Sequence, residues 1–139
     1  MPPNLFERSP ELTAERHFEG AKATLALADS MHAARDDRRF AVGWAITMLF
    51  YTAVHAVRGY LLARHRVVVS SHEDIRKYEK EHPELAKMQA PYKELKQQSE
   101  AVRYYLNEKF TWDDYAHLRS RAARVLDHWQ AQANKGPLK

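Results

Sequence analysis

The most apolar stretch of the chain predicts one long helix at its centre. Residues 40–57 contain no Asp, Glu, Lys or Arg, and they lie within a helix predicted from about Arg39 to Arg64. The stretch approaches the length of a membrane span. However, it is interrupted by Thr, Tyr and His side chains and is followed within a turn by Arg58, and such groups are costly in lipid. A helix that is apolar on all sides is typical of the centre of a helical bundle, and this is our interpretation.

Helical spacing of apolar residues, together with start and stop signals, predicts four more helices. The first begins at the N-cap Ser9 and ends before a turn at residues 35–39 (RDDRR). The β-branched residues 66–71 are interpreted as a loop, because no partner strand is found elsewhere. A short helix then opens with Ser71 as N-cap and stops at residues 81–83 (EHP).

The last two helices carry apolar stripes. The fourth begins near Pro83 and is expected to bend at Pro91, and the last begins after the N-cap Thr111. The stripe of the fourth helix comprises Leu85, Met88, Tyr92, Leu95, Ser99, Val102 and Leu106. The stripe of the last helix comprises Tyr115, Leu118, Ala122, Val125 and Trp129.

These elements predict an all-α fold, an up-down bundle of four main helices plus one short helix. The length suits one domain over residues 1–139, with an ordered core from about 9 to 131 and tails at 1–8 and 132–139. Only 4 Gly and 6 Pro are present, which favours helices over a sheet sandwich.

Composition narrows the classes of function. The absence of cysteine excludes a disulfide framework, a Cys-ligated zinc site and a thiol nucleophile. The N-terminal residues have no apolar core of a secretory signal, so a cytoplasmic location is expected. The net charge of +4 permits an anionic partner such as RNA without requiring one.

A histidine in the middle of the apolar helix is the first candidate for chemistry. His55 has Tyr51 one turn before it and Arg58 one turn after it on the same face. If this face packs on the fourth helix, His55 would meet the phenol of Tyr92, the hydroxyl of Ser99 or the guanidinium of Arg103. Two interpretations remain open: a buried polar network that satisfies its own hydrogen bonds, or a cleft that binds phosphate or moves a proton.

A second candidate lies at the start of the short helix. His72 follows the N-cap, Arg76 comes one turn later, and helix N-termini bind anions through free backbone N–H groups. No HExxH arrangement, GxSxG motif or glycine-rich phosphate loop is present, so neither a metal site nor a cofactor is expected.

The order of three stretches resembles the HEPN superfamily, whose compact helical domains occur in prokaryotic toxin–antitoxin, phage-defence and nucleotidyltransferase-linked systems. The stretches are the apolar second helix (WAITMLFYTAVHAVRGYLLARH), a Ser-His opening the next segment (SSHEDI), and an Arg-Tyr pair before a Thr-capped last helix (SEAVRYYLNEKFTWDDYAHLRSRAARVL). The resemblance covers about residues 13–130. It implies an up-down bundle that is usually a homodimer, and many active members are metal-independent ribonucleases.

The active members use an Arg followed by four to six residues and a His. The His acts as general acid or base on RNA, and the Arg stabilises charge on the phosphorane. Four pairs satisfy this spacing: Arg58–His65, Arg66–His72, Arg76–His82 and Arg121–His128. None has the Asn, Asp or His that active members often place directly after the Arg. By position, the resemblance points to His72 and to Arg103-Tyr104. With Arg76 one turn after His72, the candidate catalytic residues are His72, Arg76 and Arg103.

The sequence therefore predicts a HEPN-like protein of a toxin–antitoxin or defence-type system that binds RNA or a nucleotide and could cleave RNA without metal. The candidate ligand-binding residues are Tyr51, His55, Arg58, Tyr92, Ser99 and Tyr104. Expected partners are a second copy of the chain, RNA or a nucleotide, and a nucleotidyltransferase-type protein, with no membrane. The alternative is a non-catalytic helical dimer module that binds a protein partner or a small ligand.

Overall fold

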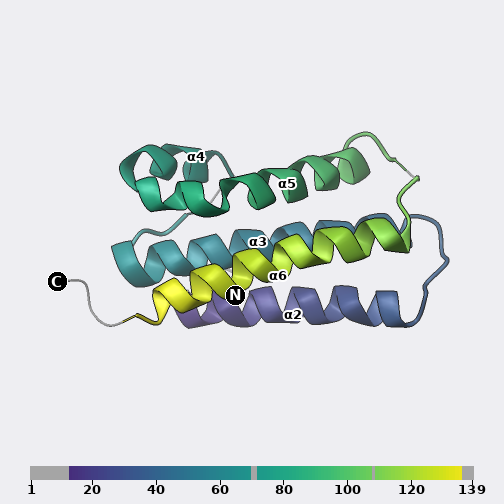
Figure 1. The fold of residues 1–139 in the computed structure, drawn as a ribbon, viewed down its shortest axis with the longest axis horizontal. Helices are drawn as coiled ribbons and strands as arrows, with labels where there is room; N and C mark the ends of the chain where they lie inside the picture. Colours follow the sequence, from purple (N-terminus) through teal and green to yellow (C-terminus); the bar gives the residue numbers. More distant parts are fainter. Residues whose placement is uncertain (1–12, 70–71, 108, 136–139) are drawn as a thin grey trace, which may run out of the picture.

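The computed structural model describes residues 13–69, 72–107 and 109–135, with the backbone alone for residues 72–74. The described chain is all-helical, as predicted. Its elements are α2 (Ala14–Ala33), α3 (Ala41–His65), α4 (His72–Glu81), the 3₁₀ helix η1 (Pro83–Met88), α5 (Gln89–Arg103) and α6 (Trp112–Ala133). Successive long helices run up and down the bundle, with α2 on one side of α3 and the α4–α5 layer on the other (Figure 1).

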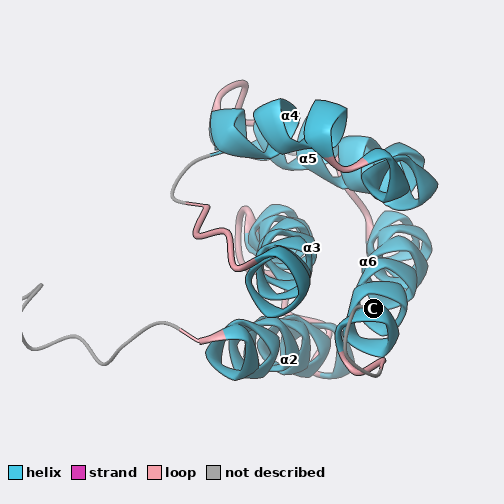
Figure 2. Cartoon of the chain, turned by 90° about the vertical axis from the view of Figure 1, so that its left-hand side faces the viewer, coloured by secondary structure: helices cyan, strands magenta, loops and turns pink. Residues whose placement is uncertain are grey.

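The apolar helix predicted at the centre is α3, which packs against α2, α5 and α6. Viewed end-on, it is bordered by α2, α6 and the α4–α5 layer, whereas its fourth side carries no described helix (Figure 2). Most of α3 is buried, including Ile46, Leu49 and Phe50. Among the described helices it alone is long and apolar enough to cross a membrane, and 72% of its most apolar window lies inside the bundle. This burial is consistent with the core helix of a soluble protein.

The ends of the helices follow from local sequence. Thr111 caps α6 through a capping box, in which its hydroxyl accepts from the Asp114 N–H and its own N–H donates to the Asp114 carboxylate. The residues predicted as the core stripe of α6 are all buried. Ser9 and Ser71, predicted as N-caps, lie outside the described residues, and the described part of the first helix is capped by Thr13.

Two predictions for the fourth helix are wrong. Pro91 does not bend it, because Pro91 lies in the first turn of α5, where its missing N–H costs no hydrogen bond. The change of geometry comes earlier, in η1. Leu106 is not in the core: α5 ends at Arg103, Leu106 has φ +50°, and its side chain is 63% exposed. The Asn107 N–H turns back to the Ala101 carbonyl at 3.0 Å and closes the helix end.

The close approach of α2 to α3 requires a glycine. A Cβ at Gly59 would lie 2.9 Å from Cε2 of Phe18 and 3.2 Å from Cβ of His17. We expect Gly59→Ala to lower the free energy of unfolding by about 1–2 kcal/mol, since the cost of overpacking exceeds the gain in helix propensity. Urea unfolding measures this. Gly20→Ala is the matched control, because the nearest atoms to its Cβ would be those of the His55 ring at 3.6 Å, an ordinary contact distance, and it should not destabilise.

Candidate functional site

The side of α3 that no described helix covers carries the candidate residues. We call this surface the α3 face and define it as Trp44, Met48, Tyr51, His55 and Arg58. Trp44 is 51% exposed and Tyr51 36%, and the other three are half-buried. Large aromatic residues on a solvent-facing side of a core helix are not explained by packing, so this surface is a candidate for binding.

At the α5 border of the face, Arg103 lies among aromatic rings. Its Cζ is 5.4 Å from the ring centroid of Phe50, 5.9 Å from that of Tyr51 and 5.0 Å from that of Tyr104. The guanidinium donates two hydrogen bonds to Ser99, one to its hydroxyl at 3.1 Å and one to its backbone carbonyl at 3.3 Å. No carboxylate pairs with Arg103 among the described residues. Within the described part of the chain its charge is therefore oriented by rings and one serine, and no ion pair neutralises it there.

At the α2 border of the face, His55 bonds to another histidine. The Nδ1 atoms of His55 and His17 are 3.2 Å apart, so one ring donates and the other accepts. His17 is buried and His55 half-buried. Burial, then the charges of His55 and Arg58, lower the pKa of His17 to about 4, and burial and Arg58 also lower the pKa of His55. Both rings are thus neutral at pH 7.

Between these borders lie two polar atoms without partners. The Nε of Arg58 and the hydroxyl of Tyr92 are buried, and neither finds a hydrogen-bond partner among the described residues. Burial raises the pKa of the Tyr92 hydroxyl, and the charge of Arg58 acts in the opposite direction. Arg58 as a whole is only half-buried, so part of its side chain stays at the surface. A guanidinium whose Nε has no partner among the described residues, beside the neutral rings of His17 and His55, is suited to an anion.

The structure brings together most of the predicted ligand-binding residues, although not in the predicted way. Ser99, Tyr51 and Tyr104 gather around Arg103, while Tyr92 and His55 lie near Arg58. The expected hydrogen bond from His55 to the fourth helix is wrong, because the ring turns to α2. His17 was missed by the sequence analysis, since its position on α2 gives no sign that it faces His55.

The predicted catalytic residues are not brought together within the described structure. The side chain of His72 lies outside the described residues, and its backbone begins α4. Arg76 is exposed on α4 and lines a cavity of about 290 Å³ between α4 and α5 with Tyr92, Lys93 and Lys96. Arg103 is not among the residues that line this cavity.

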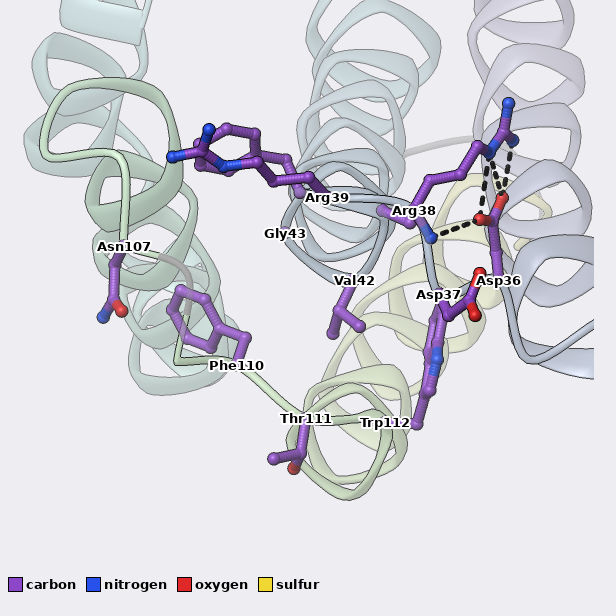
Figure 3. A pocket seen from close by; sticks show the side chains of 12 residues that line it. Asp36, Asp37, Arg38, Arg39, Val42, Gly43, Asn107, Phe110, Thr111 and Trp112 are labelled. Atoms are coloured by element: carbon purple, nitrogen blue, oxygen red, sulfur yellow. Dashed lines mark hydrogen bonds and ion pairs between the residues drawn. The ribbon is translucent and has the colours of Figure 1, made fainter.

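A larger hollow, of about 580 Å³, lies at the end of the bundle between the α2–α3 and α5–α6 connections (Figure 3). Within it, the Asp36 carboxylate accepts from the guanidinium of Arg38 at 2.6 Å and from the backbone N–H of Arg38 at 3.0 Å. Thr111, also in this hollow, caps α6. Val42, Phe110 and Trp112 form its apolar part. Because these polar groups stabilise the two connections, the α3 face is the stronger candidate.

Comparison of the chain with protein-family models, with curated proteins and with solved structures finds no match. What the α3 face binds therefore has to be inferred from its own chemistry.

Proposed function

We propose that the chain is a HEPN-like RNA-binding protein, acting in the cytoplasm as part of a toxin–antitoxin or defence-type system, and that it holds single-stranded RNA across the α3 face. The observation that carries the proposal is Arg103, held by Ser99 against three aromatic rings with no carboxylate partner among the described residues. Stacking on aromatic and guanidinium planes is how proteins bind unpaired bases.

The two borders of the face have different roles in this proposal. Tyr51 and Tyr104 offer exposed rings on which bases stack, and Arg103 offers its plane and its charge. Arg58 lies two helical turns from Tyr51, about 10 Å along α3, and offers donors to a phosphate. The net charge of +4 favours the approach of an anionic strand.

Binding of a fluorescent single-stranded RNA, followed by anisotropy at several salt concentrations, tests the proposal. We expect Tyr51→Ala and Arg103→Gln each to weaken binding by about tenfold, the usual scale of one stacked base. Arg124→Gln is the matched control, because it removes the same charge from an exposed position on α6. Equal weakening by Arg103→Gln and Arg124→Gln would mean that net charge alone drives RNA binding. That result would contradict binding at the α3 face.

Metal-independent cleavage is the catalytic part of the proposal, and its candidate residues are His72, Arg76 and Arg103. Incubation of RNA with the protein in EDTA tests it, with His72→Ala and Arg103→Ala alongside. Cleavage that persists in EDTA and is lost in both variants supports a ribonuclease. Binding without cleavage supports the non-catalytic module.

A protein partner is the second candidate, favoured by the exposed apolar residues at the end of α5. Tyr104, Tyr105 and Leu106 are 68%, 80% and 63% exposed, and Trp44 on α3 is also exposed. Exposed clusters of this kind mark contact surfaces. A second copy of the chain or a nucleotidyltransferase-type protein would cover them. If a second copy of the chain covers them, light scattering of the purified protein should measure the mass of a dimer. Trp44→Ser should then give the mass of a monomer.

A further inference from the structure

Three metal-ligating side chains meet at the end of the bundle where α3 finishes, away from the hollow in Figure 3. His65 is the last residue of α3, His82 links α4 to η1, and Glu84 lies in the first turn of η1. One donor atom from each lies within 4.8 Å of the other two, and all three side chains are half-buried. His82 and Glu84 are near neighbours in sequence, but His65 lies on another helix, so the fold brings it to the other two.

The carboxylate is already fixed in position. The hydroxyl of Tyr60 donates to Oε1 of Glu84 at 2.8 Å, and Nε2 of His65 lies 2.7 Å from the same atom. Tyr60 is itself buried, with its ring centroid 4.5 Å from that of Trp129. A buried donor that orients a ligating carboxylate is the outer hydrogen bond that protein metal sites usually contain.

The second imidazole is also held close. The rings of His65 and His82 are stacked, with centroids 3.8 Å apart and an angle of 28° between the planes. The ring of Tyr78 also stacks on that of His82, with centroids 6.2 Å apart. Two imidazoles and one carboxylate, with a fourth position left to water, are a common ligand set for zinc. Softer thiolate ligands, which would favour other metals, are absent from the sequence.

We propose that His65, His82 and Glu84 bind one Zn²⁺ ion, independently of the RNA-binding face. Binding replaces the His65–Glu84 hydrogen bond with two bonds to the ion. It also requires the two stacked rings to open, so that a nitrogen of each points to a common centre about 2.0–2.1 Å away. The Tyr60 bond to Glu84 is kept. The ion then joins the C-terminus of α3 to the α4–η1 connection.

Cobalt(II) titration of the full chain tests the site, because tetrahedral Co²⁺ in such a ligand set absorbs visible light. We expect visible bands that saturate at one ion per chain and disappear when Zn²⁺ is added. His82→Ala should weaken Co²⁺ binding at least tenfold, and Glu84→Gln should do the same. Far-UV circular dichroism confirms that both variants remain helical.

His117→Ala is the matched control, because His117 and Glu94 form a comparable histidine–carboxylate contact at 2.9 Å, with no second imidazole beside it in the described part of the chain. This variant should bind Co²⁺ as the unmodified chain does. No visible bands, or equal loss in His117→Ala and His82→Ala, would overturn the proposal. RNA binding should be unchanged by His82→Ala, so a failure here is distinguishable from a failure of the proposed function.

Discussion

The free energy of unfolding is expected to fall by about 2 kcal/mol as the pH is lowered from 6.5 to 5, because the His17–His55 pair must stay neutral in the folded chain. The pKa of His17 is lowered from 6.5 to about 4 by burial, then by His55 and Arg58, and that of His55 is lowered by burial and by Arg58. Below pH 6.5 the unfolded chain takes up protons that the folded chain does not, so acid favours unfolding. The loss is complete once the pH has passed the folded value near 4.

Carboxylates contribute at lower pH and can be separated from this effect. Side-chain hydrogen bonds lower the pKa of three carboxylates, although burial acts to raise each of them. The donors are Arg119 and Tyr115 for Asp29, Tyr60 and then His65 for Glu84, and His117 and Arg121 for Glu94. Their contribution is present above the unfolded values of 3.8 to 4.5 and is lost only as the pH falls through the lowered values. The slope between pH 6.5 and 5 therefore reports histidines: the His17–His55 pair, together with His128, whose pKa is also lowered, by burial and then by Lys87, Lys135 and Arg124.

Urea unfolding at a series of pH values measures the slope, and variants assign it. His55→Leu alone leaves the buried Nδ1 of His17 without a partner and should cost about 1–3 kcal/mol at pH 7. The double variant His17→Phe/His55→Leu removes both partners and should reduce the slope at a smaller cost, leaving the contribution of His128. The exposed His117→Phe is the control and should keep the slope. A slope that is unchanged in the double variant would show that other groups cause it.

The fold was predictable because its signals are local and repeated. The apolar run that became α3 and the Thr111 capping box each act within a few residues, and α3 and α6 begin within two residues of the predicted positions. The errors arose where tertiary geometry decides. Leu106 continues the stripe of α5 in sequence, yet it lies beyond a helix end closed by the Asn107 bond.

The candidate site was only partly predictable, for a related reason. Helical spacing places Tyr51, His55 and Arg58 on one face, and the structure agrees. Spacing cannot say which neighbouring helix covers which edge of that face. His55 therefore hydrogen-bonds to His17 on α2, whereas the sequence predicts a partner on the fourth helix. The cluster of His65, His82 and Glu84 was missed because its spacing matches no sequence motif, and only the turn through η1 brings the three together.

Removal of the Asp29 carboxylate is expected to lower the free energy of unfolding by about 2–3 kcal/mol. Tyr115 is fully buried, and its hydroxyl donates to Oδ1 of Asp29 at 2.6 Å. Arg119 donates to both oxygens of the same carboxylate, at 3.0 and 2.9 Å. In Asp29→Ala the buried hydroxyl loses its acceptor, which accounts for most of the cost. The ion pair is partly exposed and adds less.

A double-mutant cycle with Tyr115→Phe separates these two contributions. Tyr115→Phe alone should cost about 1 kcal/mol, the usual net value of one hydrogen bond. In the double variant no buried hydroxyl is left without a partner, so Asp29→Ala should cost less there than in the unmodified chain. If the costs of the two single substitutions add up in the double variant, the Tyr115 hydroxyl does not lose its hydrogen bonding in Asp29→Ala. The loss of stability would then come from the ion pair with Arg119. Since Asp29 lies on α2 and both partners on α6, the coupling measures how firmly these helices are joined beside α3.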